Sequence, residues 1–381
     1  MIPGALGAWH DCRPHDTIDA VMGRRPGLGG VALPRMSILR RVVAGLAVAW
    51  PVAGLAVMWL AMPAAVLSHG ADSIVPPSPS DFLLDWTFDP TVAIPLLVLG
   101  VGYVFAVRHV NAQHPTNRVP LGRVAAFVAG LLVIEIALQS IIERYDTTLF
   151  SVHMVQHVLL TLVASPLLAL GAPITLALRY ARPDFRRRWI LPILHSRVVR
   201  AVTFPVVAWL LFAGAMWGTH FSPIFNASLT EPLLHQAEHV IYLVVGLLFW
   251  WPAVGADPSP WRMPHPVRAL YLFLQMPQNT FLALAIYGAA GPLYPHYAAI
   301  NLLMPWAPPA LADQQIAGGL MWVVGDVIFI LSIVLVVAGW MRSEDHETAR
   351  RERQDDVARA AIRAREAALA ERLARDRSGQ S

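Results

Sequence analysis

Eight long apolar segments account for most of this chain, and they constrain its fold more than any other feature. They run roughly over residues 39–67, 91–108, 121–142, 151–178, 198–219, 233–254, 268–290 and 316–341. A helix that crosses a bilayer needs about 20 apolar residues. Because lipid cannot hydrogen-bond an open backbone, such segments form helices. The pattern predicts an all-α fold: a polytopic integral membrane helical bundle with seven core transmembrane helices and one N-terminal anchor or signal-like helix.

The composition agrees with a membrane protein. Apolar residues make up 56% of the chain and charged residues 14%, and the mean hydropathy is +0.51. A soluble domain of this length is ordinarily far more polar. The net charge of +4 comes from arginine, because the chain contains no lysine. These arginines gather at the ends of apolar segments, which indicates membrane topology and no nucleic-acid partner. Cys12 is the one cysteine, so the membrane part offers no thiolate to a metal.

The connections between the apolar segments alternate in charge. The 108–123 and 179–200 connections are rich in arginine, whereas the alternate connections carry acidic residues, among them Asp85 and the Glu143 to Asp146 stretch. Cytoplasmic loops carry the excess of arginine in membrane proteins. The alternation therefore predicts that both termini are cytoplasmic.

Two pairs of histidines stand where apolar segments begin. His153 and His157 open the 151–178 segment, and His235 and His239 open the 233–254 segment. A spacing of four residues places both imidazoles of a pair on one helix face, with Cβ atoms about 5–6 Å apart. Ionisable side chains inside a membrane are costly and usually functional. Since both segments enter from the outer side, the pairs predict a metal site that faces the periplasm or the cell exterior.

Further candidate ligands fall on the same side of the membrane. His220 follows the 198–219 segment, and Met154 lies between the histidines of the first pair. Imidazole and thioether without thiolate suit copper, particularly Cu(I), better than magnesium or calcium. Zinc also accepts imidazole and stays an alternative. The predicted metal ligands are His153, His157, His235, His239, His220 and Met154.

Each of these residues also has a structural interpretation. Histidines in a membrane bundle often make hydrogen bonds between helices, and methionine is a common core residue. Glu238 is either a carboxylate that orients a ligand imidazole or an acid at the membrane interface. Asp326 and Glu135 lie within apolar segments, where a carboxylate must be protonated, paired or hydrated.

Short motifs follow one another along the core of the chain. They are His153-Met154-Val155-Gln156-His157, Ser165-Pro166, Gly171-Ala172-Pro173, Trp217-Gly218-Thr219-His220-Phe221, His235-Gln236-Ala237-Glu238-His239, Gln275-Met276-Pro277-Gln278-Asn279, Asp313-Gln314-Gln315, Gly318-Gly319 and Met321-Trp322. In this order, over roughly residues 82–345, the chain resembles the CtaG-type (caa3-type) cytochrome c oxidase assembly factors of bacteria. Those proteins are seven-helix membrane proteins.

The resemblance implies a function. It implies an assembly factor, not an enzyme, that assists copper insertion into a haem-copper terminal oxidase through an outer-face histidine site, with copper held transiently. The implied partners are the catalytic subunit of the oxidase, periplasmic copper chaperones and the lipid bilayer. The implied location is the bacterial inner or plasma membrane.

Other functions stay open at the level of the residues. A CopD-like membrane copper transporter needs ligand groups that continue to the cytoplasmic side, and these thin out after the outer half of the bundle. A membrane metallohydrolase needs a general acid or base beside a metal-bound water, for which Glu238 is the adjacent candidate. The histidine pairs could also hold haem between two helices.

The chain divides into five predicted parts. Residues 1–38 form a lead that lacks the apolar pattern, and Met36 is a plausible start. The 39–67 segment is a transmembrane anchor or signal segment; it exceeds the apolar core of a signal peptide, which has about 7–15 residues. Residues 68–90 form an outer linker, and 91–342 a seven-helix CtaG-like membrane domain. Residues 343–381 form a charged cytoplasmic tail, predicted to be a solvated helix.

Overall fold

The structure is a computed structural model that describes residues 74–378. Within that range the chain forms helices and connections, with no strand. The helices outside the main bundle are α3 (Asp81–Leu84), α6 (Ile141–Tyr145), α9 (Pro173–Tyr180), α10 (Pro183–Phe185), η2 (Arg186–Ile190), α11 (Leu191–Leu194), α12 (Arg197–Val202), α14 (Pro223–Ser228) and α17 (Pro295–Asn301). The predicted lead, the predicted anchor over 39–67 and the first part of the outer linker lie outside the described residues.

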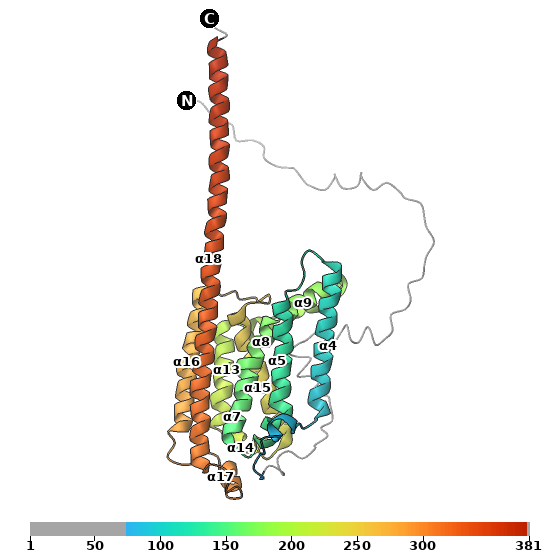
Figure 1. The fold of residues 1–381 in the computed structure, drawn as a ribbon, viewed down its shortest axis with the longest axis vertical. Helices are drawn as coiled ribbons and strands as arrows, with labels where there is room; N and C mark the ends of the chain where they lie inside the picture. Colours follow the sequence, from blue (N-terminus) through green and yellow to red (C-terminus); the bar gives the residue numbers. More distant parts are fainter. Residues whose placement is uncertain (1–73, 379–381) are drawn as a thin grey trace, which may run out of the picture. The chain divides into compact units, whose positions relative to one another are not determined.

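The bundle consists of long helices that run side by side (Figure 1). They are α4 (Pro90–Gln113), α5 (Leu121–Gln139), the continuous stretch α7 (Phe150–Val158), η1 (Leu159–Ala164) and α8 (Ser165–Leu170), then α13 (Pro205–His220), α15 (Pro232–Val254), α16 (His265–Tyr287) and α18 (Ala310–Ser378). Among residues 74–378, six helical stretches are long and apolar enough to cross a membrane. The all-α, polytopic fold class is thereby confirmed. The helix α13 has 16 residues and is shorter than these six.

Proline determines where several of these helices begin. The first helical residue is Pro90 in α4, Pro205 in α13 and Pro232 in α15. Proline suits this position because its missing N–H would have no intrahelical partner there and its φ angle is already helical. The opposite end of α15 is closed by Gly255, whose φ of 61° is the left-handed conformation that ends many helices.

Two predicted segments are broken in the structure. The 198–219 segment divides into α12 and α13, because a residue before proline avoids the helical conformation and Phe204 is extended. The 151–178 segment breaks at Ala172, which has a positive φ of 49°, and α9 then starts at Pro173. In both cases a proline ends a helix that apolar character alone would continue.

The long helix that begins at Phe150 contains a π-helical turn, η1, which starts two residues after His157. Side chains bind the carbonyl groups that this turn exposes: the Thr161 hydroxyl donates to the carbonyl of His157 (2.6 Å), and the Ser165 hydroxyl to that of Leu160 (2.8 Å). The indole of Trp250 donates to the carbonyl of Thr161 (2.9 Å), which ties α15 to the same turn. Such turns recur at functional sites.

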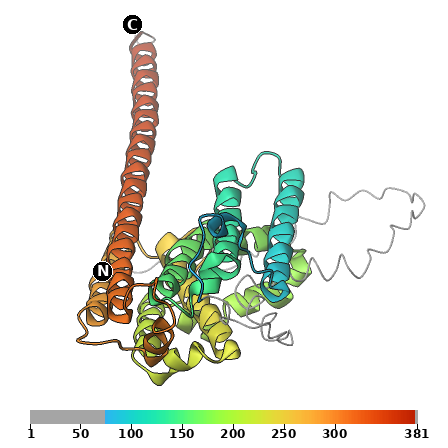
Figure 2. The same ribbon diagram turned by 60° about the horizontal axis from the view of Figure 1, so that its bottom comes forward.

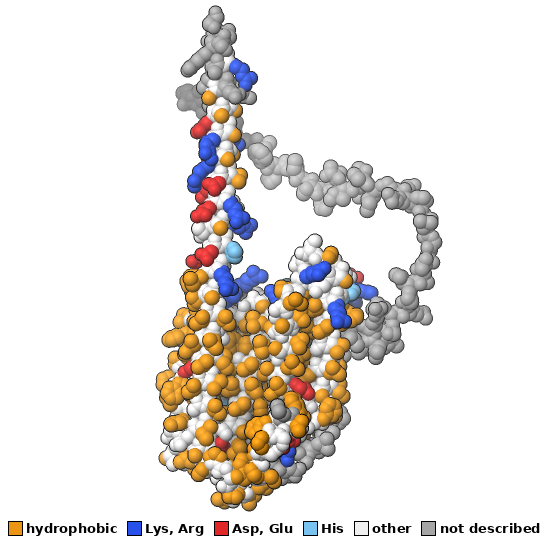
Figure 3. All heavy atoms as spheres, viewed as in Figure 1, with side chains coloured by type: hydrophobic (Ala, Val, Ile, Leu, Met, Phe, Trp, Pro, Cys, Tyr) orange, Lys and Arg blue, Asp and Glu red, His pale blue; other side chains and the backbone are white. Residues whose placement is uncertain are grey.

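A large apolar cluster fills the bundle between α7, α13, α15, α16 and α18. Its largest members include Phe150, Phe225, Tyr242, Phe249 and Phe329, which are at most 1% exposed. The outward faces are also apolar: Leu97 is 66%, Phe281 65% and Leu335 71% exposed. Figure 3 shows this apolar surface as a broad band around the bundle. A band of this kind matches a lipid environment.

The two ends of the bundle differ. In Figure 3, basic side chains gather at the end from which α18 projects. The short helices α14 and α17 lie at the opposite end, which Figure 2 tips toward the viewer. Beyond Arg342, α18 continues as a helix to Ser378, with mostly exposed residues and charges of both signs.

Carboxylates within the bundle have polar partners. Asp326 accepts a hydrogen bond from Thr280 (3.0 Å), and Glu135 accepts one from the Gln139 amide (2.7 Å). The motif that contains Pro277 also supplies Asn279, whose amide donates to the carbonyl of Met321 (2.9 Å). These contacts link α16 to α18 and join neighbouring turns of α5.

Candidate metal centre

Five imidazoles from three helices meet at the end of the bundle opposite to the basic side chains. His153 and His157 come from α7, His235 and His239 from the first turns of α15, and His220 is the last residue of α13. All five are at most 4% exposed. The ring centroids lie 4.1 Å apart for His153 and His157, 4.4 Å for His235 and His239, and 5.5 Å for His153 and His235. The structure thus brings all the predicted histidine ligands together.

The first turn of α7 is held in place by α18. Asp313 accepts hydrogen bonds from the backbone N–H groups of Phe150 (2.6 Å) and Ser151 (3.3 Å), and from the Ser151 hydroxyl. Leu149 precedes the helix and provides no side-chain cap. A carboxylate on these N–H groups also interacts favourably with the helix dipole. Asp313 therefore fixes the helix end that carries His153.

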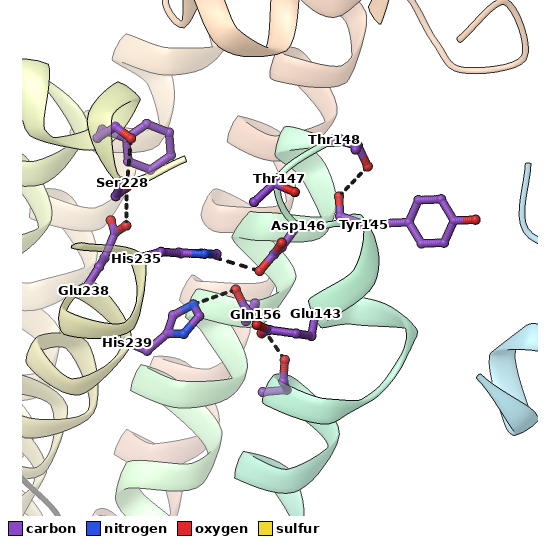
Figure 4. A network of polar contacts seen from close by, with 12 residues as sticks. Glu143, Tyr145, Asp146, Thr147, Thr148, Gln156, Ser228, His235, Glu238 and His239 are labelled. Carbon is purple, nitrogen blue, oxygen red and sulfur yellow. Dashed lines mark hydrogen bonds and ion pairs between the residues drawn. The ribbon is translucent and has the colours of Figure 1, made fainter. Parts of the chain in front are cut away.

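Two buried carboxylates join the imidazoles in two groups of three. Asp146 belongs with His235 and His239, and Glu238 belongs with His153 and His157. In each group the candidate ligand atoms lie within 4.8 Å of one another. Figure 4 shows His235 directed toward Asp146, with 3.5 Å between His235 Nε2 and Asp146 Oδ2.

Gln156 determines the tautomer of His239. Its amide nitrogen donates to the Ala137 carbonyl (2.9 Å) and to Glu143 Oε2 (2.7 Å), so its oxygen must be the atom that faces His239 Nε2 at 2.9 Å (Figure 4). That oxygen can only accept a hydrogen bond. His239 Nε2 therefore carries the proton, and its Nδ1 carries the lone pair that a metal needs.

His220 is held as the opposite tautomer, with the proton on Nδ1. Its Nδ1 lies 2.7 Å from the carbonyl oxygen of Met216, which can only accept. Nε2 is then the nitrogen with the lone pair, and this atom is buried with no hydrogen bond among the described residues. The ring of His220 lies 6.0 Å from that of His157. A backbone carbonyl thus holds His220 ready to serve as a ligand.

Other polar atoms in the cluster are buried without hydrogen bonds to the described residues. They include both ring nitrogens of His153, both ring nitrogens of His157, and Oε1 of Glu238. The other Glu238 oxygen accepts a hydrogen bond from Ser228 (2.7 Å). Buried polar atoms are almost always satisfied by protein, water or an ion. Imidazole nitrogens and carboxylate oxygens are the donor set of transition-metal sites. The arrangement fits a bound metal.

Burial also affects Asp146. It raises the pKa of the Asp146 carboxyl well above its ordinary value, and the nearby Glu143 carboxylate raises it further. Buried charge is poorly tolerated unless it is paired or coordinates a metal. A cation next to Asp146 would therefore favour its ionised form.

Met154 is placed differently from the histidines. It is fully buried within the large apolar cluster, together with Phe150 and Phe225. Its role as a ligand stays a prediction. His296, at the same end of the bundle, has its Nε2 2.9 Å from the carbonyl of Thr147 and supports the loop that carries Asp146.

Asp146 is the site residue that sequence reasoning missed. It appeared as one of several acids in an outer connection, where a carboxylate is ordinarily solvated. Its position seven residues before His153 was the available signal, because a short connection places that carboxylate near the start of the histidine helix. Glu238 was recognised, but the structure places it with the imidazoles of the neighbouring helix.

Replacing Gln156 with leucine is expected to weaken metal binding by about 10- to 100-fold, the usual cost of losing a group that orients a ligand imidazole. Without the amide oxygen, His239 Nδ1 no longer has to carry the lone pair. Gln314→Leu is the matched control, since that amide is equally buried but contacts Leu293 and Ile286. Competition titration with a metal-binding dye measures the affinity. Equal affinities for the two variants would show that Gln156 does not position His239.

The fold and the cluster together define a polytopic helical membrane protein with a buried histidine and carboxylate centre. Residues 101–343 match the cytochrome c oxidase caa3 assembly factor family (Caa3_CtaG), and the chain belongs to this family.

Similar proteins occur in mycobacteria. The chain is 33% identical over 288 residues to uncharacterised proteins of Mycobacterium bovis and Mycobacterium tuberculosis, which covers 74% of this chain and 43% of each relative. It is 33% identical over 284 residues to an uncharacterised protein of Mycobacterium leprae, covering 73% and 42%. The chain thus spans less than half the length of these relatives. No solved structure matches it.

Proposed function

We propose that this chain holds copper in the histidine cluster and assists its insertion into the catalytic subunit of a haem-copper oxidase. Membership of the caa3 assembly factor family supports the link to the oxidase. The observation that carries the copper assignment is the convergence of five buried imidazoles, with His220 and His239 held as tautomers that can bind metal.

The proposed topology places this cluster at the outer face. Basic side chains gather at the other end of the bundle (Figure 3), and basic residues favour the cytoplasmic side. In this arrangement α13 is the seventh core helix within the 91–342 domain, and the 343–381 tail is cytoplasmic. The 39–67 segment would be the anchor that precedes the 68–90 linker, and 1–38 the lead.

Copper is the proposed ion because the proposed recipient, a haem-copper oxidase, requires it. A delivery site must load its metal and also release it, and a site of imidazoles without thiolate holds copper less tightly than a thiolate site does. His153, His157, His235, His239 and His220 would hold the ion, with Met154 as an auxiliary ligand. The oxidase subunit would receive it, periplasmic copper chaperones would supply it, and the protein would catalyse no reaction.

The test is the metal content of the oxidase. In a bacterium that contains this protein and a haem-copper oxidase, deletion of its gene is expected to leave an oxidase catalytic subunit that contains haem but little copper. Reintroducing the gene should restore the copper. The readout is the ratio of copper to haem in the purified oxidase. An unchanged ratio in the deletion strain would refute the proposed function.

A further inference from the structure

We propose that the cluster is a two-ion centre for divalent cations. His153, His157 and Glu238 would hold one ion, and Asp146, His235 and His239 the other. The inference rests on the proposed function only in taking the cluster to bind metal. It adds the number of ions, their charge and two carboxylate ligands.

The two groups are built reciprocally. Glu238 lies between His235 and His239 in the sequence, yet its carboxylate joins the imidazoles of α7. Asp146 lies four residues before the start of α7, in the connection from α6, yet its carboxylate joins the imidazoles of α15. Each histidine pair is therefore completed by an acid from the segment that carries the other pair. One helix supplies no complete ligand set alone, so both groups form only when α7 and α15 pack together.

The geometry of each group suits a separate ion. Nitrogen and oxygen ligands bind such ions at about 2.0–2.2 Å, so ligand atoms on one ion are about 4 Å apart or less. Ligand atoms within 4.8 Å need only a small movement to reach this spacing. Two ions in shared sites lie about 3.5–4 Å apart. His153 and His235, one from each group, have stacked rings with centroids 5.5 Å apart, so the two groups are neighbours.

The number of ligands also exceeds the need of one ion. Five imidazoles and two carboxylates surround the cluster, whereas zinc in a protein ordinarily takes four ligands. His220 can supply a fourth ligand to the ion held by His153, His157 and Glu238. Its Nε2 is buried with no hydrogen bond among the described residues, and its ring lies beside that of His157. The ion held by Asp146, His235 and His239 has three protein ligands. The first ion is therefore expected to bind more tightly than the second.

The carboxylates favour divalent ions over Cu(I). Carboxylate oxygen is a hard ligand, and each of the two groups consists of two imidazoles and one carboxylate. Each group carries one ionisable carboxyl, so a divalent ion compensates the charge that burial would otherwise leave unpaired. Zn²⁺ and Cu²⁺ both match two imidazoles and a carboxylate.

Metal counting tests the inference. The full chain is purified in detergent, loaded with Zn²⁺, separated from free metal and analysed for zinc per protein. Two ions per chain are expected. Asp146→Asn and Glu238→Gln are each expected to retain one, because each removes a carboxylate from one group. Asp326→Asn, a carboxylate that bonds Thr280 outside the cluster, should retain two. One ion in the unaltered chain, or two ions in both acid variants, would overturn the inference.

Metal counting in the acid variants requires that they fold. Spectroscopy with Cu²⁺ provides a second readout that can be made on the unaltered chain alone. Two adjacent Cu²⁺ ions couple magnetically, so the loaded chain should show a broadened or weakened electron paramagnetic resonance signal. Each folded acid variant should show the signal of an isolated Cu²⁺. An isolated signal from the fully loaded, unaltered chain contradicts a two-ion centre, whether or not the variants fold.

The two proposals fail in different ways. Two bound ions together with an oxidase whose copper does not depend on this protein would leave the two-ion centre intact and refute the delivery function. One bound ion together with a copper-deficient oxidase in the deletion strain would do the reverse.

Discussion

A chain in which His157 and His239 are both replaced by alanine is expected to accumulate in the membrane in normal amount and to leave the oxidase as inactive as gene deletion does. The variant removes one imidazole from each histidine pair. His157 has both ring nitrogens buried without hydrogen bonds among the described residues, so its loss breaks no such bond. The measurements are oxidase activity, membrane copper and the amount of the protein in the same membranes.

The matched control replaces His195 and His265, which lie outside the cluster, at the end of α11 and the start of α16. That variant should support normal activity. Alanine leaves cavities in a buried site. A second cluster variant, His157→Gln with His239→Gln, is therefore tested beside the alanine variant, because glutamine retains much of the side-chain volume. If every cluster variant disappears from the membrane while the control remains, the histidines stabilise the fold and the site hypothesis fails.

Replacing Gly318 with leucine is expected to separate α16 from α18 and to destabilise the whole bundle. A Cβ atom at Gly318 would lie 2.9 Å from the carbonyl oxygen of Ala283 and 3.0 Å from the backbone nitrogen of Tyr287. Backbone atoms cannot move aside as a flexible side chain can, so the helices must part. Overpacking of this kind costs about 1–3 kcal/mol, and a larger side chain against backbone lies at the upper end. Thermal unfolding in detergent measures the loss.

Gly319→Leu is the matched control, one residue along the same helix. No other atom lies within 4 Å of a Cβ built there. Replacing a helical glycine where a side chain has room ordinarily stabilises a helix by up to about 1 kcal/mol. The two variants should therefore change the unfolding temperature in opposite directions. A similar change in both would show that Gly318 does not set the distance between α16 and α18.

Much of the fold could be predicted from the sequence because a membrane limits the choice of structure. Long apolar segments must be helical in lipid, and the segments that became α4, α5, α15 and α16 were recognised on this basis. The boundaries were less predictable. Hydropathy does not register that Pro205 and Pro173 end the preceding segments, and the positive φ of Ala172 depends on tertiary packing. The same holds for the π-helical turn after His157.

The candidate site was predictable where it depends on helix periodicity. The spacing within each histidine pair places its imidazoles on one face, and the position at helix starts places both pairs at one end of the bundle. The partners across helices were not predictable. That Asp146 faces the α15 histidines, and that Gln156 orients His239, depends on how α7 and α15 pack together.

The most direct test of the metal centre is the copper content of the purified protein. The full chain and a variant with alanine at His153, His157, His235 and His239 are loaded with copper in detergent and analysed for copper per chain. We expect at least one copper ion per unaltered chain and almost none in a folded variant. Equal copper in both, or none in either, would contradict the assignment of this cluster as a metal centre.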